Sequence, residues 1–233
     1  MIALATAAGG PLQPGTASQP GRCVVGLCGG VGCGKSTAAR WLQQWGALHC
    51  DVDAIGHQVL GRGEPGAQAV AARFGPSILD KTGTVDRKVL GALVFSDPAA
   101  LAVLNALLHP LMCARIDGQI EAWQSAPAAP ALFVVDAALL FDMGLDSRCD
   151  ETLAISARQD VQVARIAAAR GLSEQQARDR VAAQPAAAQW RRRASAVIDN
   201  DGSLGEFAQA VARWWSDLST RRALGLAVPE RDE

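Results

Sequence analysis

Short apolar runs alternate with longer amphipathic stretches along most of this chain. Each run has the length and the content of apolar and β-branched residues that is typical of a buried strand. The runs are residues 24–28, 47–50, 131–135, 152–156 and 196–198. Helical patterns lie between them, so the alternation predicts an α/β fold with a parallel sheet covered on both faces. In such a fold, ligands bind at the carboxyl ends of the strands.

Two of the intervals are too long for simple crossover connections, which indicates insertions beside the sheet. The interval between the second and third runs spans roughly eighty residues and has a helical pattern almost throughout. Its predicted helices are residues 66–74, 87–95, 98–108 and 110–123. The second insertion covers residues 158–193, where eight arginines and three acids give a local charge of +5.

A glycine-rich segment follows the first apolar run and precedes a helical pattern. Residues 29–37 read GGVGCGKST, which contains the full spacing of a phosphate-binding loop, G-x4-G-K-S/T. Glycines let backbone N–H groups surround phosphates at a helix N-terminus, where the helix dipole also favours anions. Lys35 is then expected to reach the β- and γ-phosphates, and the Ser36 hydroxyl to bind Mg²⁺. A glycine turn before an ordinary helix would need all these features to coincide by chance.

Carboxylates follow two of the predicted strands. In extended chain, Asp51 and Asp53 would share a face while Val52 points toward the core. Asp53 suits the role of a general base toward an attacking hydroxyl or of an outer Mg²⁺ ligand, and the structural alternative is a helix N-cap. Asp136 ends the third strand, where it could act through water on the same ion, and Asp142 lies in the loop that follows.

The basic insertion could close over a nucleotide, because arginines neutralise charge on a transferred phosphoryl group. We expect Arg165 and Arg170 to contact phosphate, since they flank a helix end at Gly171, and Ser173 with Gln176 forms a capping box for the next helix. The run 191–193 could equally be a solvated helix face. His109 precedes a proline, so from the residues alone it is a helix-end residue.

Net charge, apolar stretches and cysteine spacing argue against several classes of protein. The net charge of −1 argues against general affinity for nucleic acid or anionic membranes, and no apolar stretch is expected to approach the ~20 residues of a membrane span. The start of the chain lacks the basic residues of a secretory signal, so we expect a cytoplasmic protein. The cysteines show no zinc-type spacing and are expected to be reduced. Cys33, in the phosphate loop, is the exception, because a thiol near a helix N-terminus can become more acidic and reactive.

Taken together, the motifs resemble those of the dephospho-coenzyme A kinase family over residues 23–215. The resemblance depends on several separated segments besides the phosphate loop, in the same order along the chain. They are residues 25–37, 51–53, 83–87, 94–98, 109–111, 139–141 and 197–200. The chain differs from the family pattern at Cys33, Ala138, Asp142, Trp190 and Ser195.

The resemblance implies ATP-dependent phosphorylation of the ribose 3′-hydroxyl of dephospho-coenzyme A, the last step of coenzyme A biosynthesis. It implies a P-loop kinase fold with a five-stranded parallel core, a helical substrate-binding insertion and a helical lid. The expected core is residues 22–56, 130–157 and 194–219, the insertion 57–129 and the lid 158–193, with flexible tails at 1–21 and 220–233. The substrate is a small molecule, and we expect a monomer or weak homo-oligomer that binds neither nucleic acid nor membrane.

The resemblance also implies roles for individual residues. Asp53, Lys35 and Arg165 are the expected catalytic residues, and His57 and His109 lie at substrate-binding positions. Mg²⁺ would be held by Ser36, with Asp53 or Asp136 acting through water. The residues expected to bind ATP are Gly30, Val31, Gly32, Cys33, Gly34, Lys35, Ser36, Thr37 and Arg170.

Two other functions stay open from the sequence. The nearer one is a kinase of the same fold that acts on another small hydroxyl compound or nucleotide. The more distant one is a non-enzymatic protein that senses ATP, in which the basic insertion would bind a partner. A panel of acceptor substrates tests for the other kinase. Replacement of Asp53 tests for the ATP-sensing protein, because only a catalyst needs a base.

Overall fold

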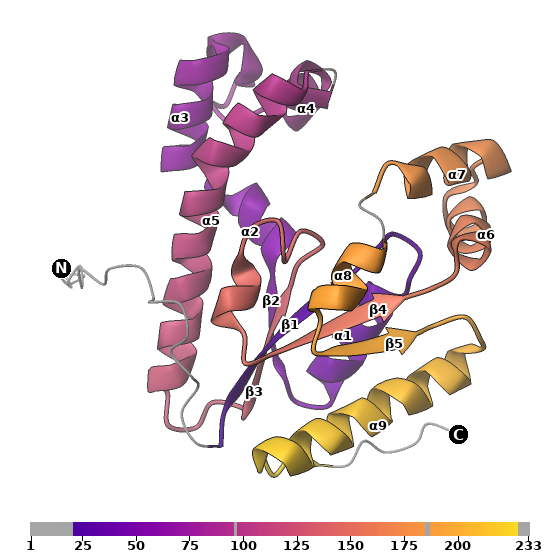
Figure 1. The fold of residues 1–233 in the computed structure, drawn as a ribbon. Helices are drawn as coiled ribbons and strands as arrows, with labels where there is room; N and C mark the ends of the chain where they lie inside the picture. Colours follow the sequence, from indigo (N-terminus) through magenta and orange to yellow (C-terminus); the bar gives the residue numbers. More distant parts are fainter. Residues whose placement is uncertain (1–20, 96, 185–186, 228–233) are drawn as a thin grey trace. The chain divides into compact units, whose positions relative to one another are not determined.

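The structure is a computed structural model in which residues 21–95, 97–184 and 187–227 are described (Figure 1). The chain divides into two compact units. Among the described residues, the larger unit contains 21–52 and those from 122 onward, and the smaller unit contains residues 53–121. The expected N-terminal tail, residues 1–21, lies outside the described residues except for Gly21.

The larger unit is built on a five-stranded sheet in the order β2-β3-β1-β4-β5, and every pair of neighbouring strands is parallel. This confirms the expected fold class, and each predicted strand bound is correct to within one residue. The strands are β1 (Cys23–Gly29), β2 (Leu48–Asp51), β3 (Leu132–Asp136), β4 (Glu151–Ser156) and β5 (Ala196–Asp199). All residues of β1, β3 and β4 are buried, which is why apolar side chains dominate β1 and β3, whereas β4 also buries the polar residues Glu151, Thr152 and Ser156.

Helices α1 (Lys35–Gln44) and α9 (Leu204–Arg222) pack on one face of this sheet. Leu42 of α1 and Trp215 of α9 are both fully buried in a core that includes Val25, Leu153 and other strand residues. The expected lid region, where it is described, forms α6 (Gln159–Arg170), α7 (Glu174–Ala182) and α8 (Ala187–Arg193). A short 3₁₀ helix, η2 (Leu145–Arg148), precedes β4.

The smaller unit is helical, as the pattern of the first long interval predicted. Its elements are α2 (Val52–Val59), α3 (Pro65–Phe74), the 3₁₀ helix η1 (Pro76–Ile78), α4 (Arg87–Phe95) and α5 (Pro98–Ser125). Helix α2 begins one residue before the unit, and α5 ends beyond it. Leu79 and Val85 form a single antiparallel bridge between η1 and α4. Arg115 of α5 forms an ion pair with Glu64, the residue before α3.

Helix α5 corrects two expectations. We predicted two helices separated at His109, but one helix runs through Pro110, which lacks the N–H of the helical ladder. The predicted absence of a long apolar stretch is also wrong, because α5 is long and apolar enough to cross a membrane, with a mean hydropathy of 1.6 over 18 of its residues. Length and composition alone do not place it in one, since core helices of soluble proteins pass the same test.

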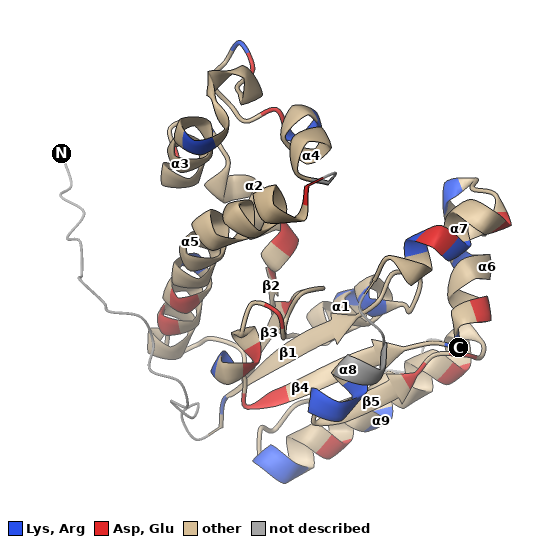
Figure 2. Cartoon of the chain, turned by 45° about the horizontal axis from the view of Figure 1, so that its top comes forward, with Lys and Arg blue, Asp and Glu red and all other residues tan. Residues whose placement is uncertain are grey.

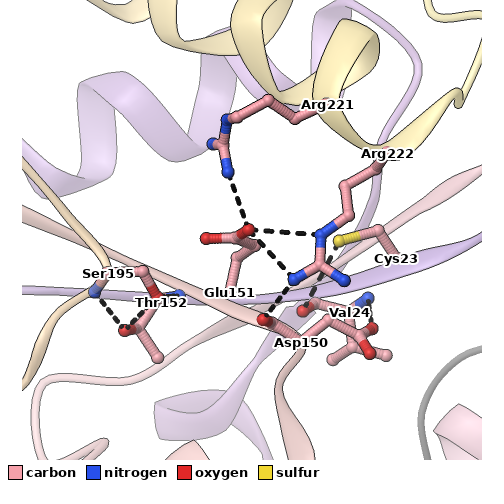
Figure 3. A network of polar contacts seen from close by, with 8 residues as sticks. All are labelled: Cys23, Val24, Asp150, Glu151, Thr152, Ser195, Arg221 and Arg222. Carbon is pink, nitrogen blue, oxygen red and sulfur yellow. Dashed lines mark hydrogen bonds and ion pairs between the residues drawn. The ribbon is translucent and has the colours of Figure 1, made fainter.

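The C-terminal part of α9 is joined to the beginning of β4 by a polar network (Figure 3). Glu151 is buried and accepts hydrogen bonds from Arg221 at 2.9 Å and from Nη2 of Arg222 at 3.0 Å. Arg222 also donates to the carbonyl of Asp150, whose carboxylate accepts from the N–H of Val24. The network therefore connects α9 with the amino-terminal ends of β4 and β1.

Part of the segment expected to be a C-terminal tail, 220–233, is packed in the structure. Helix α9 continues to Arg222, and Leu224 is buried against the core of the larger unit. The indole N–H of Trp215 donates to the carbonyl of Ala227 at 2.9 Å. Residues 228–233 lie outside the described residues.

Candidate functional site

The glycine-rich loop connects β1 to α1, as the sequence predicted. Gly34 is the N-cap residue of α1 and has φ 97°, a conformation that side chains with a Cβ rarely adopt. A Cβ at Gly34 would also lie 2.5 Å from Nδ2 of Asn200. No described side chain caps the N-terminus of α1, and Lys35 is its first residue. The loop thus presents a ten-residue helix whose terminal N–H groups and dipole favour an anion.

Polar side chains from distant parts of the larger unit hold this loop. The amide of Asn200, which follows β5, donates to the carbonyl of Cys33 at 2.8 Å. Gln162 of α6 donates to the Cys33 sulfur and to the carbonyl of Ala157. Gln184 accepts a hydrogen bond from the N–H of Val31 at 2.8 Å, so one amide of the loop is occupied by a side-chain oxygen. A cavity of about 340 Å³ lies beside Asn200 and the first turns of α9.

Lys35 forms an ion pair with Asp136, at the carboxyl end of β3. Asp136 is 8% exposed and also accepts a hydrogen bond from Nε2 of His49 at 3.1 Å. The three residues come from α1, β3 and β2, and strand pairing places Asp51 beside Asp136 and His49 beside Val134. The carboxylate is therefore contacted on both oxygens, by Lys35 on Oδ1 and by His49 on Oδ2.

The charge of Asp136 follows from these contacts. Burial raises the pKa of the carboxyl, but the hydrogen bond from His49 and the nearby Lys35 ammonium outweigh burial and hold the pKa below its usual value. Asp136 is consequently an anion at neutral pH. Asp136 ends the third strand as the sequence predicted, whereas its ion pair with the phosphate-loop lysine was not predicted.

The segment from Asp51 to Asp53 differs from its predicted conformation. Asp51 ends β2 and Val52 is buried, as expected, but Val52 already begins α2. Asp53 is an exposed residue in the first turn of that helix, so neither the shared extended face nor the N-cap role is correct. Helical geometry turns successive side chains by about 100°, so the two carboxylates do not follow strand alternation.

The other two residues expected at the substrate site lie in the smaller unit. His57 is exposed in the last turn of α2. His109 is half-buried in α5, one residue before Pro110. Since α5 continues through this position, His109 is a mid-helix residue and the helix-end interpretation is wrong.

The two arginines expected to contact phosphate have different surroundings. Arg165 of α6 donates to the carbonyls of Asn200 and Gly202, at 2.8 and 3.2 Å, and is half-buried. In this structure Arg165 therefore holds the loop after β5. Arg170 is exposed in the last turn of α6, and Gly171 ends that helix in a left-handed conformation, as predicted.

The arginine run at the end of α8 forms the blue part of that helix in Figure 2, and two of its arginines pair with acids. Arg191 forms an ion pair with Asp199 of β5 and contacts Ser156 at 3.3 Å. Arg193 pairs with Asp146 at 2.8 Å and lies 4.5 Å from the ring centre of Phe141. Two of the three arginines thus contact other elements of the larger unit and do not form a purely solvated face.

The donors expected for Mg²⁺ are consistent with an ion that arrives with a nucleotide. Ser36 is exposed in the first turn of α1, immediately after Lys35. In the described part of the chain, no group of three or more His, Cys, Asp or Glu side chains could hold a metal by itself. Mg²⁺ in phosphoryl-transfer sites commonly takes few protein ligands and completes its shell with phosphates and water. Asp142, the other candidate acid, is exposed in the loop after β3.

The thiol of Cys33 is not acidic, although its place near a helix N-terminus could favour an acidic thiol. The residue is fully buried, and burial raises the pKa of its thiol above the usual value in spite of hydrogen bonds that act in the opposite direction. The pKa of the buried thiols of Cys28 and Cys50 is likewise raised to about 12 by burial. The helix N-terminus does not compensate for the loss of water around a thiolate here.

Sequence reasoning missed the residues that hold the site together: His49, Gln162, Gln184 and Asn200. For His49 a signal was present, because a polar residue two positions before Asp51 on the same strand must share its face. The partners of the other three are set by tertiary contacts across more than a hundred residues.

Comparison with known proteins gives consistent results. A family model described as dephospho-CoA kinase matches residues 23–206. The chain is 41% identical over 197 residues to a dephospho-CoA kinase of Streptomyces avermitilis, with 84% of this chain and 94% of the relative covered. It is 37% identical to one of Thermobifida fusca, covering 84% of this chain and 96% of that relative.

Among solved structures, TT1252 from Thermus thermophilus has a TM-score of 0.65 and 32% sequence identity, covering 84% of this chain and 98% of that one. A dephospho-CoA kinase from Campylobacter jejuni has a TM-score of 0.58 at 23% identity and covers 86% of this chain and 99% of its own. The latter likeness supports the fold alone.

Proposed function

This chain belongs to the dephospho-CoA kinase family, and on that basis we propose that it transfers the γ-phosphoryl group of ATP to the ribose 3′-hydroxyl of dephospho-coenzyme A. The observation that carries the proposal is the phosphate loop between β1 and α1, with Lys35 at the helix start. A helix N-terminus of this kind favours a triphosphate, and the family match identifies the acceptor class.

In the proposed mechanism, catalysis comes mainly from positioning and charge neutralisation in an in-line transfer. The backbone of residues 30–37 surrounds the phosphates, and Lys35 contacts the transferred group. Asp53, two residues beyond the carboxyl end of β2, orients the acceptor hydroxyl and takes its proton. His57 and His109, both in the helical unit, bind the acceptor substrate.

Mg²⁺ and the lid arginines complete the proposal. Ser36 would hold Mg²⁺, with Asp53 or Asp136 acting through water, and the ion would neutralise charge on the phosphates. Arg170, which is exposed in the last turn of α6, would contact phosphate. For Arg165 to do the same, it must exchange its present contacts with Asn200 and Gly202 for contacts with the nucleotide.

The direct test is a substrate panel. The purified chain is incubated with ATP, Mg²⁺ and either dephospho-coenzyme A, shikimate, gluconate or a nucleoside monophosphate, and formation of ADP is measured. We expect turnover with dephospho-coenzyme A and a 3′-phosphorylated product by mass spectrometry. Turnover with only one of the other acceptors would replace this function by that of another small-molecule kinase.

Replacement of Asp53 separates a catalyst from an ATP-sensing protein. We expect Asp53→Asn to lower kcat by about 10²- to 10⁴-fold, because the acceptor hydroxyl loses its base, while the Kd for ATP changes little. The matched control is Asp217→Asn, which alters an exposed acid of α9 and should leave kcat unchanged. Full activity of Asp53→Asn would contradict the assigned base.

A further inference from the structure

His49 is a polar residue in the short strand β2, and its ring contacts the anion that pairs with the phosphate-loop lysine. The Nε2 atom of His49 lies 3.1 Å from Oδ2 of Asp136, whose Oδ1 contacts the ammonium of Lys35. The side chains of Lys35, His49 and Asp136 are 15%, 19% and 9% exposed. These contacts form a short chain of side chains from β2 through β3 to α1.

The direction of the hydrogen bond follows from the charge of its acceptor. An ionised carboxylate only accepts hydrogen bonds, so Nε2 of His49 must carry the proton and donate it. Strand pairing explains the geometry. His49 pairs with Val134, two residue pairs before the pair of Asp51 and Asp136, so the side chains of His49 and Asp136 lie on the same face of the sheet. Each carboxylate oxygen of Asp136 then has its own donor, which defines the orientation of the carboxyl plane.

We propose that His49 is a positioning residue for phosphoryl transfer, which acts on Lys35 through Asp136. The proposal rests on the function proposed above. The hydrogen bond of the His49 ring goes to Asp136 and not to the phosphate loop. Its N–H holds Asp136 so that Oδ1 faces Lys35, and Asp136 in turn limits the positions open to the lysine ammonium before and during transfer.

Loss of the Nε2–H donor of His49 would leave the ammonium of Lys35 held less firmly, although no group that touches phosphate is removed. Oδ2 of Asp136 would lose its donor, and the carboxylate would be free to rotate about the Cβ–Cγ bond. The ammonium of Lys35 would then occupy a wider range of positions. Errors of about 1 Å in a reacting geometry can cost up to about 100-fold in rate, so a partial loosening is expected to cost about tenfold.

Two substitutions at one position separate the hydrogen bond from the bulk of the ring. His49→Phe keeps a planar ring but has no N–H, and His49→Gln places an amide N–H near the position of Nε2. We expect His49→Phe to lower kcat about tenfold and to change the KM for dephospho-coenzyme A by less than about twofold. His49→Gln should recover kcat to within about threefold of the unmodified protein.

Melting temperatures of both variants identify a purely structural role. The proposal is wrong if His49→Phe and His49→Gln lower kcat equally while both variants melt at the temperature of the unmodified protein. It is also wrong if His49→Phe retains full kcat. Should His49→Phe not fold, His49→Val, which suits a strand, takes its place in the same comparison with Gln.

The tautomer of the His49 ring can be measured without substrate, so this measurement tests the positioning role independently of the kinase activity. In the unmodified protein at about pH 8, above the usual pKa of imidazole, nitrogen NMR of the histidine rings reports which nitrogen carries the proton. We expect the Nε2–H tautomer at His49. A predominant Nδ1–H tautomer would overturn the positioning role even if the kinase assay succeeds, whereas absence of kinase activity with the Nε2–H tautomer would overturn the function alone.

Discussion

At the scale of single residues, burial decides the chemistry of Cys33. The thiol lies in the phosphate loop next to a helix N-terminus, which favoured an acidic thiol from sequence alone. In the folded chain the side chain is enclosed, Gln162 donates to its sulfur, and burial raises its pKa. A thiol with a raised pKa has less thiolate at neutral pH and therefore reacts more slowly.

We therefore expect slow alkylation of Cys33 in the native protein. Iodoacetamide at about pH 8, followed by peptide mass spectrometry, should modify Cys33 more than about tenfold more slowly than in the same chain unfolded in urea. The unfolded chain is the control for intrinsic reactivity. Preferential labelling of Cys33 in the native state would contradict the burial described here.

At the scale of elements, local signals at helix ends were more informative than breaks inside helices. The capping box of Ser173 and Gln176 at the start of α7 was predicted and is present. A second box, formed by Ser203 and Glu206, begins α9 and was not predicted. Pro110 was expected to end a helix, yet α5 continues through it, because packing along a long helix can outweigh one missing hydrogen bond.

The Ser203 cap should contribute measurably to stability, since α9 covers one face of the sheet. Ser203→Ala removes the acceptor for the N–H of Glu206 and is expected to lower the free energy of unfolding by about 1 kcal/mol. Ser203→Thr keeps the hydroxyl and serves as the control, with a smaller loss. Urea denaturation measures both variants, and equal stability of Ser203→Ala and the unmodified chain would show that this cap contributes nothing.

At the scale of the molecule, ion pairs as well as the apolar core hold the larger unit together, because they connect the end of α9 to the start of β4. Glu151 is buried at the start of β4, and its partners, Arg221 and Arg222, are half-exposed at the end of α9 (Figure 3). The pairing is therefore asymmetric. Removal of the arginines leaves a buried carboxylate without its cations, whereas removal of the carboxylate leaves arginines that water can solvate.

This asymmetry predicts unequal effects on stability. The double variant Arg221→Ala/Arg222→Ala should lower the free energy of unfolding by about 2–3 kcal/mol. Glu151→Gln should lower the free energy of unfolding by less than about 1 kcal/mol, because water can solvate Arg221 and Arg222 after their ion pairs are lost. Thermal or urea unfolding of both variants makes the comparison. A larger loss in Glu151→Gln than in the double variant would contradict this interpretation.

Much of the architecture was predictable because it depends on short-range patterns. Short, mostly apolar runs indicated all five strands, and the signal was clearest for β1 and β3, whose residues are all buried and almost all apolar. The spacing of glycines before Lys35 indicated the phosphate loop, because the required backbone conformation depends on residues next to one another. The same holds for the helix end at Gly171.

The pattern of residues did not reveal the contacts between segments that lie far apart in the chain. The pairing of His49 with Asp136, the contacts of Arg165 with the loop after β5 and the enclosure of Cys33 all depend on strand order and helix packing. Local sequence carries propensity and periodicity, so it identified the strands and the anion-binding loop. The partners and protonation of charged groups depend on which distant side chains exclude water from them, and only the folded arrangement determines that.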